Sequence, residues 1–329
     1  MHDVHTENKT LISDVAADGG LYLPRSMHYF SGSEIAEFKN APFNEIFATV
    51  LNHFFSDQLT RQDIDLFIGK NPVKILPVGR KILVAQAWHN PARAYKYLEN
   101  NIYKKLCKGA VADTPTEWLK IAVRISLIFS TYGELLRSGQ VSSTQPLDVA
   151  VDADNFTSTV AAFYAKQIGL PIGRLICGCD ETGALWDFIH LGEVSTGSAP
   201  DALLRMLERL IHARFGADEV EKFLQVCQKR GTYRIPQETE NDLPESIFCA
   251  VVGKERISAV INSVYRTDDF FMDIGAARSF GAVQDYRAKT GNSNPTLLLS
   301  DCHPLQESDL IMNATGLSQN AFYDKCRII

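Results

Sequence analysis

The stretch LDVAVDADNFTSTVAAFYAKQIGLPIGRLIC, residues 147–177, decides the fold class. It opens with an apolar run of strand length, LDVAV, and passes through the polar turn DADNFTS into TVAAFYAKQI, a segment of helical length that ends at Gly169. A second apolar run, IGRLIC, follows. A strand, a helix and a strand in this order form a βαβ unit, with parallel strands and a right-handed crossover. We therefore predict an α/β protein built on a parallel sheet.

Two more apolar runs predict buried strands, KILVAQAW at residues 81–88 and TLLLS at residues 296–300. Polar residues follow each predicted strand. Ligands of open parallel sheets bind beyond the carboxyl ends of the strands. We therefore expect a site where three polar segments meet, namely HNPARAYK (89–96), DADNFTS (152–158) and SDCHP (300–304).

Helical patterns account for much of the remaining chain. FNEIFATVLNHFF, residues 43–55, is amphipathic and predicts an N-terminal helical subdomain. A long helix is predicted with Thr114 as its N-cap, Pro115 at its first position, Glu117 completing a capping box and Gly139 as its stop. Another follows in DALLRMLERLIHARFG, residues 201–216, whose Glu208 and Arg209 we interpret as a helix ion pair or a solvated face.

Composition excludes several classes of function. The 329 residues are 45% hydrophobic and 22% charged, with a formal net charge of −6. This balance favours a protein of about two domains and disfavours nucleic acid or a membrane surface as partner. The N-terminus lacks a secretory pattern, so we expect a cytoplasmic protein. Seven cysteines suit reduced thiols, and we interpret Cys177 and Cys179 as buried thiols because no second ligand pair at zinc spacing accompanies them.

Several segments, in order along the chain, resemble the threonine synthase family. ADGGLYLP (17–24) resembles the family's Pro-Asp-Gly-Gly-Leu-Tyr-Val-Pro, and HNPARAYKY (89–97) resembles His-Gly-Pro-Thr-x-Ala-Phe-Lys-Asp. VDADNFTS (151–158) is similar to Val-Pro-Thr-Gly-Asn-Phe-Gly-Asn, the family's phosphate-binding turn. LERLI (207–211) and LLLSDCHP (297–304) are similar to Phe-Glu-Arg-Leu-Leu and Leu-Ser-Thr-Ala-His-Pro.

The resemblance implies a pyridoxal-phosphate (PLP) enzyme of fold type II, which converts O-phosphohomoserine to threonine with release of phosphate. It places Lys96 on the lysine that forms the Schiff base, and it makes cofactor-binding residues of Lys96, Asp154, Asn155, Phe156, Thr157, Ser158 and Asp301. No metal is implied. It divides the chain into a threonine synthase-like subdomain, residues 1–78, and a PLP-enzyme-like α/β domain, residues 79–329.

The sequence also departs from the family. The substrate loop Thr-Ser-Gly-Asp-Thr-Gly is absent, and only 58 positions separate Lys96 from Asp154, so we expect the small substrate-binding domain to be deleted between about residues 108 and 114. Asp154 and Thr157 replace the two glycines of the phosphate turn. A carboxylate 4 Å from a phosphate is repelled by about 1 kcal/mol per charge pair in water, and by more in a cleft. Asp152 adds to this repulsion. We therefore predict impaired PLP binding.

Two hypotheses remain open at this point. One is a pseudoenzyme that acts as a binding or regulatory partner. The other is an active PLP-dependent lyase acting on O-phosphohomoserine or a related amino acid, either with a different substrate or with its missing domain supplied by a separate chain. A third possibility is a metabolite with a cationic or amine group, bound near Asp154. Residues 154–158 are interpreted either as a cofactor cradle or as an ordinary helix N-cap. Lys96 is either a Schiff-base lysine or a lysine that faces solvent. His89 is either a residue of the cleft or a turn residue, and we interpret His303 as structural. A homodimer or a protein partner would cover the apolar face that a lost domain leaves.

Overall fold

The structure, a computed structural model, describes residues 13–15, 20–24, 26–55, 59–69, 73–87, 95–107, 115–236 and 245–326. The side chains of Tyr95 and Lys96 are outside this description. His89, Thr114 and the proposed deletion point at residues 108–114 also lie outside it.

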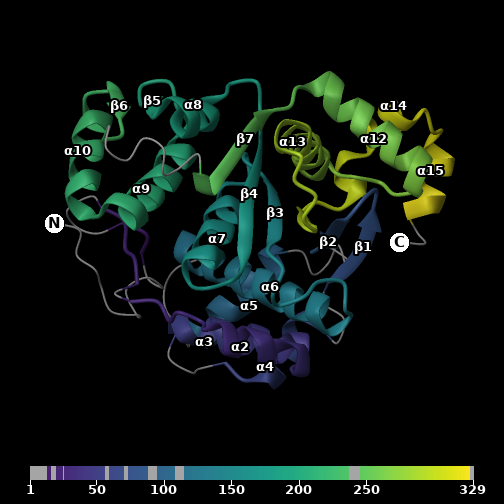
Figure 1. Ribbon diagram of the computed structural model, residues 1–329, viewed down its shortest axis with the longest axis horizontal. Helices are drawn as coiled ribbons and strands as arrows, with labels where there is room; N and C mark the ends of the chain where they lie inside the picture. Colours follow the sequence, from purple (N-terminus) through teal and green to yellow (C-terminus); the bar gives the residue numbers. More distant parts are fainter. Residues whose placement is uncertain are drawn as a thin grey trace.

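A six-stranded sheet forms the centre of the molecule (Figure 1). Its order is β1-β2-β8-β3-β4-β7, and every pair is parallel except the β1–β2 hairpin. The α/β class and the parallel βαβ unit β3–α7–β4 are therefore confirmed. The bounds are β1 (Lys74–Val78), β2 (Ile82–Gln86), β8 (Thr296–Ser300), β3 (Leu147–Asp152), β4 (Ile172–Cys179) and β7 (Ile247–Val251).

Helices cover both faces of the sheet, which explains why its strands read as continuous apolar runs. On β8, Leu297 and Leu299 join a core with α7 (Phe156–Gln167) and α6 (Glu117–Arg137), whereas Leu298 joins the core under α12 (Lys254–Asp268) and α13 (Ile274–Thr290). Cys177 and Cys179 are buried on β4, as expected. None of the described helices has the length and apolar composition needed to cross a bilayer.

The N-terminal helices pack on α6, at the lower end of the view in Figure 1. They are α2 (Gly32–Glu37), the 3-10 turn η1 (Phe38–Asn40), α3 (Phe43–Phe55) and α4 (Arg61–Ile68), with α5 (Tyr95–Cys107) beside α4 and α6. The ring centroids of Phe129 on α6 and Phe30 lie 4.9 Å apart. The helical subdomain thus shares a core with the sheet, and the predicted boundary at residue 78 stays a prediction.

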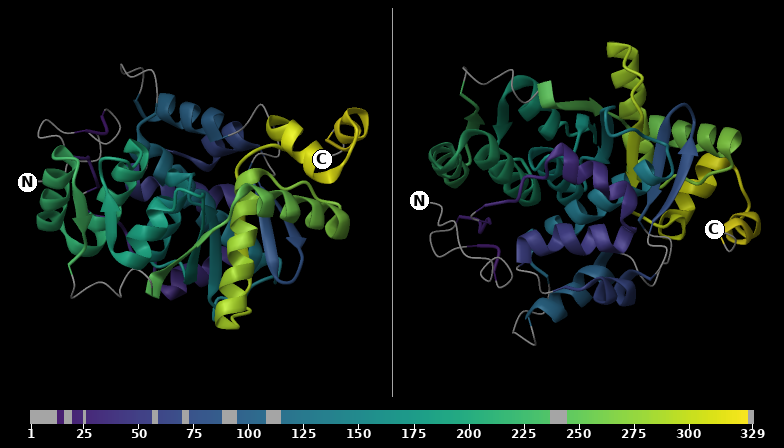
Figure 2. Two further views of the ribbon diagram at one scale, coloured as in Figure 1. Left: turned by 90° about the horizontal axis from the view of Figure 1, so that it is seen from above. Right: turned by 60° about the horizontal axis from the view of Figure 1, so that its bottom comes forward.

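Two groups of elements lie at opposite sides of the sheet (Figures 1 and 2). One contains α8 (Ala184–Leu191), β5 (Glu193–Ser195), α9 (Asp201–Phe215), α10 (Ala217–Gln228) and β6 (Thr232–Arg234). The other contains α12 with the C-terminal η4 (Pro304–Glu307), α14 (Ser308–Thr315) and α15 (Gln319–Cys326).

Two predictions about helices are wrong in detail. The long helix α6 begins at Glu117, and its N-cap is Thr116 rather than Thr114, because the Thr116 hydroxyl accepts a hydrogen bond from the Leu119 N–H at 3.3 Å. Glu208 and Arg209 are not a solvated face, since both are buried on α9. Glu208 Oε1 accepts a hydrogen bond from the Leu21 N–H at 3.1 Å, so the N-terminal segment covers this side of the helix.

Candidate functional site at the carboxyl ends of the strands

The turn between β3 and α7 holds five of the predicted site residues, Asp154 to Ser158. Asn155 is the N-cap of α7, and its side-chain oxygen accepts a hydrogen bond from the Ser158 N–H at 3.2 Å. The Asp154 N–H donates to Asp152 Oδ1 at 3.2 Å. The turn is therefore organised by its own side chains with Asn155 as the helix N-cap, and the choice between a cofactor cradle and an ordinary N-cap stays a prediction.

Asp301 meets this turn from the neighbouring strand β8. Its Oδ2 accepts hydrogen bonds from Asn155 Nδ2 and, at 2.9 Å, from Ser158 Oγ. The carboxyl ends of adjacent parallel strands lie at one edge of the sheet, which explains why residues 146 positions apart touch. The structure thus brings Asn155, Ser158 and Asp301 together, while their role toward a cofactor stays a prediction.

Arg278 on α13 is a site residue that the sequence analysis missed. Its Nη1 donates to Asp152 Oδ1 at 2.6 Å and to Asp154 Oδ2 at 2.5 Å. The two carboxylates are consequently not the unpaired charges that the sequence suggested. Burial raises the pKa of Asp152 to about 6, although Arg278 acts in the opposite direction. Nothing in the sequence around Arg278 indicates this pairing, which tertiary packing alone creates.

Negative charge still predominates at this edge. Among the described residues, Arg278 pairs with Asp152 and Asp154, and Asp301 accepts hydrogen bonds from Asn155 and Ser158. The next arginine, Arg124, donates from Nη1 to the buried Glu99 at 2.5 Å and from Nε to Ser158 Oγ at 3.1 Å, so Glu99 already balances its charge. These residues do not fit a dianionic phosphate, because they repel it and because side chains replace the glycines that would let the backbone approach it.

A buried acid extends the negative region behind Asp301. Asp273 is the N-cap of α13, accepts from the Ala276 N–H at 2.7 Å and accepts from Ser300 Oγ at 2.5 Å. Burial raises its pKa to about 7, with Glu307 and Asp301 acting in the same direction. His303 caps η4 by accepting from the Leu305 N–H at 3.1 Å, in agreement with the structural role predicted for it.

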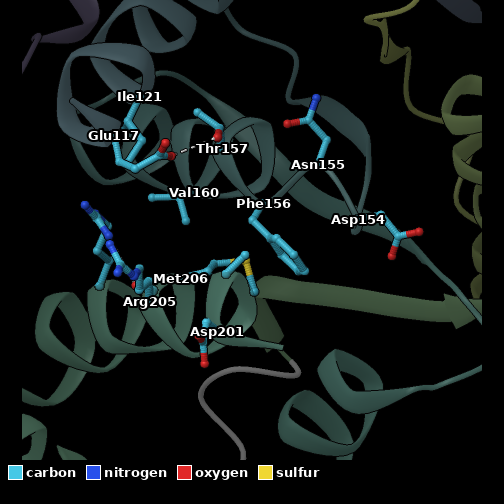
Figure 3. A pocket seen from close by; sticks show the side chains of 12 residues that line it. Glu117, Ile121, Asp154, Asn155, Phe156, Thr157, Val160, Asp201, Arg205 and Met206 are labelled. Atoms are coloured by element: carbon cyan, nitrogen blue, oxygen red, sulfur yellow. Dashed lines mark hydrogen bonds between the residues drawn. The ribbon is translucent and has the colours of Figure 1, made fainter. Parts of the chain in front are cut away.

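The remaining predicted residues, Lys96, Phe156 and Thr157, take no part in the hydrogen bonds to Asp301 described above. Lys96 is in the first turn of α5, but its side chain is outside the described atoms. Phe156 and Thr157 line a cavity between α6, α7 and α9, and Thr157 Oγ1 donates to Glu117 Oε2 at 3.4 Å (Figure 3). The first turn of α7 therefore has one side bonded to Asp301 and another side open to a cavity.

The sheet order, the helices on both faces and the strand-end turn define an α/β protein of the kind found in fold type II PLP enzymes. A family model described as "Threonine synthase N terminus" matches residues 2–71. Threonine synthase from Brucella melitensis, solved with PLP bound, aligns with a TM-score of 0.79 at 15% identity over 95% of this chain and 89% of that chain.

Curated proteins agree with this assignment. The human protein threonine synthase-like 1 is 24% identical over 214 residues, which are 61% of this chain and 28% of that protein. Threonine synthase from Corynebacterium glutamicum is 23% identical over 192 residues, 53% of this chain and 39% of that enzyme. Over these parts of its length, the chain is similar to threonine synthases and threonine synthase-like proteins. It spans less than a third of the human relative's length.

Proposed function

We propose that this protein is a threonine synthase-like pseudoenzyme, in which PLP binding is impaired, catalysis is lost and binding is the remaining activity. One observation carries the proposal: Asp301 is hydrogen-bonded directly to Asn155 and Ser158 of the turn that would hold the cofactor phosphate. Asp152 and Asp154 flank the same turn with a single arginine between them. A phosphate would have to displace these bonds and enter a negative field.

The second candidate function is an active PLP-dependent lyase acting on O-phosphohomoserine or a related amino acid. It is favoured by Lys96, which lies at the motif position of the Schiff-base lysine, and by Asn155, which the family turn also has. When bound, PLP would supply an electron sink for elimination at the amino acid. The turn described above does not suit its phosphate, and the predicted loss of the small domain means that this candidate has either a different substrate or a separate chain that supplies the domain.

The proposal includes a cytoplasmic location and a homodimer or a protein partner that covers the face left by the missing domain. Leu305 and Tyr323 are exposed large apolar residues that line one hollow near the C-terminal helices, and they support a partner because such side chains often mark association surfaces when they gather. Solution scattering should give a particle larger than one chain, and a clean monomer would count against this part of the proposal.

An assay of phosphate release tests the two candidates directly. The purified chain is incubated with PLP and O-phosphohomoserine, with the Corynebacterium glutamicum threonine synthase as positive control and Lys96→Ala as negative control. The pseudoenzyme proposal predicts release no faster than with Lys96→Ala. Release that depends on Lys96 would establish the lyase instead.

A further inference from the structure

A second candidate site lies on the other side of the first turn of α7. A cavity of about 420 Å³ separates α6, α7 and α9, and Figure 3 shows Glu117 and Ile121 at one wall and Arg205 and Met206 at the opposite wall. Ser158, which bonds Asp301, does not line it. Its lining consists of Glu117, Ile121, Asp154, Asn155, Phe156, Thr157, Val160, Asp201, Ala202, Arg205, Met206 and Arg209.

Arg209 is a buried cation whose hydrogen-bonding groups are incompletely used. Only 2% of the residue is exposed. Its Nη1 donates to the Arg205 carbonyl oxygen at 3.3 Å, and its Nη2 lies 4.0 Å from Asp14 Oδ1, too far for a hydrogen bond. Within the described residues, Nε and Nη2 have no hydrogen-bond partner. Buried polar groups normally have partners, so these two N–H groups retain unused capacity to donate hydrogen bonds.

The neighbouring carboxylates are engaged with other groups. Glu117 Oε1 is 2.6 Å from Lys120 Nζ, and Asp154 is paired with Arg278. Asp14 accepts a hydrogen bond from the Glu117 N–H at 2.8 Å, and burial raises its pKa, although Arg209 acts in the opposite direction.

The groups left to meet a ligand are mainly positive. In the part of the chain that the structure describes, neither Arg205 nor Asp201 has a salt bridge within 4.0 Å. Arg205 and Arg209 are one helical turn apart on α9, and the N-terminus of α7 adds its positive dipole end. Ile121, Val160 and Met206, all buried, supply an apolar wall.

We infer that this cavity binds a small organic carboxylate with an apolar body. The carboxylate pairs with the guanidinium of Arg209, which lines the cavity, and with Arg205 at the exposed mouth. The apolar body contacts Ile121, Val160 and Met206. The inference goes beyond the proposed pseudoenzyme and holds whether or not catalysis survives, because no atom of the cavity needs PLP.

Isothermal titration calorimetry on the full chain without PLP tests the inference with three probes of one shape. They are 4-methylpentanoate, its uncharged amide, and leucine, which adds an ammonium group. We expect one 4-methylpentanoate to bind per chain at millimolar concentration or tighter, and the amide and leucine to bind at least about tenfold more weakly. No binding of 4-methylpentanoate would overturn the inference, as would an amide that binds equally. Tighter binding of leucine would overturn the assignment of a plain carboxylate.

Variants locate the binding. Arg209→Gln should weaken the affinity for 4-methylpentanoate at least about tenfold. Arg205→Gln should weaken this affinity by less, because Arg205 is exposed. Arg234→Gln, on the exposed strand β6, removes the same charge far from the lining and should bind as the wild type does. If Arg209→Gln does not fold, Ala202→Trp at the exposed mouth serves instead and should abolish binding. Unchanged binding in either Arg209→Gln or Ala202→Trp would overturn the inference. Because PLP is absent, the result is independent of the phosphate-release assay.

Discussion

The first turn of α7 presents two sides with opposite properties. On the Asp301 side, Asn155 and Ser158 donate to a carboxylate, and the surrounding acids outnumber the arginines. On the cavity side, Phe156 and Thr157 face a space that Arg205 and Arg209 also line. The same helix N-terminus serves both sides. The proposed loss of the cofactor role on one side is therefore compatible with the proposed binding of an anion on the other side.

Helical geometry allows this separation. Successive residues of a helix are about 100° apart, so Ser158 points away from Phe156 and Thr157 although all three belong to one turn. On the Asp301 side, Asn155 and Ser158 donate to a carboxylate of the protein, whereas Nε and Nη2 of Arg209 have no hydrogen-bond partner among the described residues. The predictions below test this difference.

The largest effect on stability is expected for Arg278→Leu. The substitution leaves Asp152 without its cation, and only 19% of the Asp152 side chain is exposed. We expect the free energy of unfolding in urea to fall by about 3 kcal/mol at pH 7. Arg256→Leu, which breaks the more exposed pair with Asp285, is the matched control and should cost about 1 kcal/mol or less. Equal costs for the two variants would contradict the importance of the Arg278 cluster.

A smaller effect, which depends on pH, is expected for Asp273→Asn. The pKa of Asp273 is raised to about 7 in the folded protein, whereas the unfolded chain has the ordinary Asp value of about 4. The protonated carboxyl therefore makes its full contribution to stability below pH 4, and this contribution is lost as pH rises through 7. Asn keeps an acceptor for the Ala276 N–H and carries no charge. Between pH 5 and pH 8, the free energy of unfolding in urea should therefore fall by about 2 kcal/mol less for the variant than for the wild type. Asp309→Asn, at an exposed position, should follow the wild-type profile.

The smallest effects compare the two sides of the turn directly. Ser158→Ala removes the hydroxyl that donates to Asp301 and accepts from Arg124, in a residue that is 1% exposed, and should cost about 1 to 2 kcal/mol in thermal or urea unfolding. Thr157→Ala, on the cavity side, loses only a contact of 3.4 Å with Glu117 and should cost about 0.5 kcal/mol or less. The reverse order of costs would contradict the contrast between the sides.

Local sequence patterns were sufficient for the main elements of the fold. The apolar runs at β3, β4 and β8 and the turn at Asn155 follow from strand length, burial on both faces and N-cap chemistry. The meeting of that turn with Asp301 follows from parallel strands whose carboxyl ends share one edge.

The pairing of residues far apart in the chain could not be predicted from the sequence. Arg278 is 124 positions from Asp154, and no local pattern links a helix arginine to one acid rather than another. Arg209 looked like a surface residue because helical periodicity identifies the apolar face but cannot reveal that the N-terminal segment, through Asp14 and Leu21, covers the polar face. Both of the arginines that distinguish the two sides of α7 were therefore found only in the structure.

Titration of the purified chain with PLP tests the central claim most directly, with the absorbance of lysine-bound cofactor as the signal and Lys96→Ala as the control. The account predicts that micromolar PLP gives no saturable absorbance that distinguishes the wild type from Lys96→Ala, because the carboxylates at residues 152, 154 and 301 oppose the phosphate. A band that saturates at micromolar PLP in the wild type and disappears in Lys96→Ala would contradict the account and favour the active lyase.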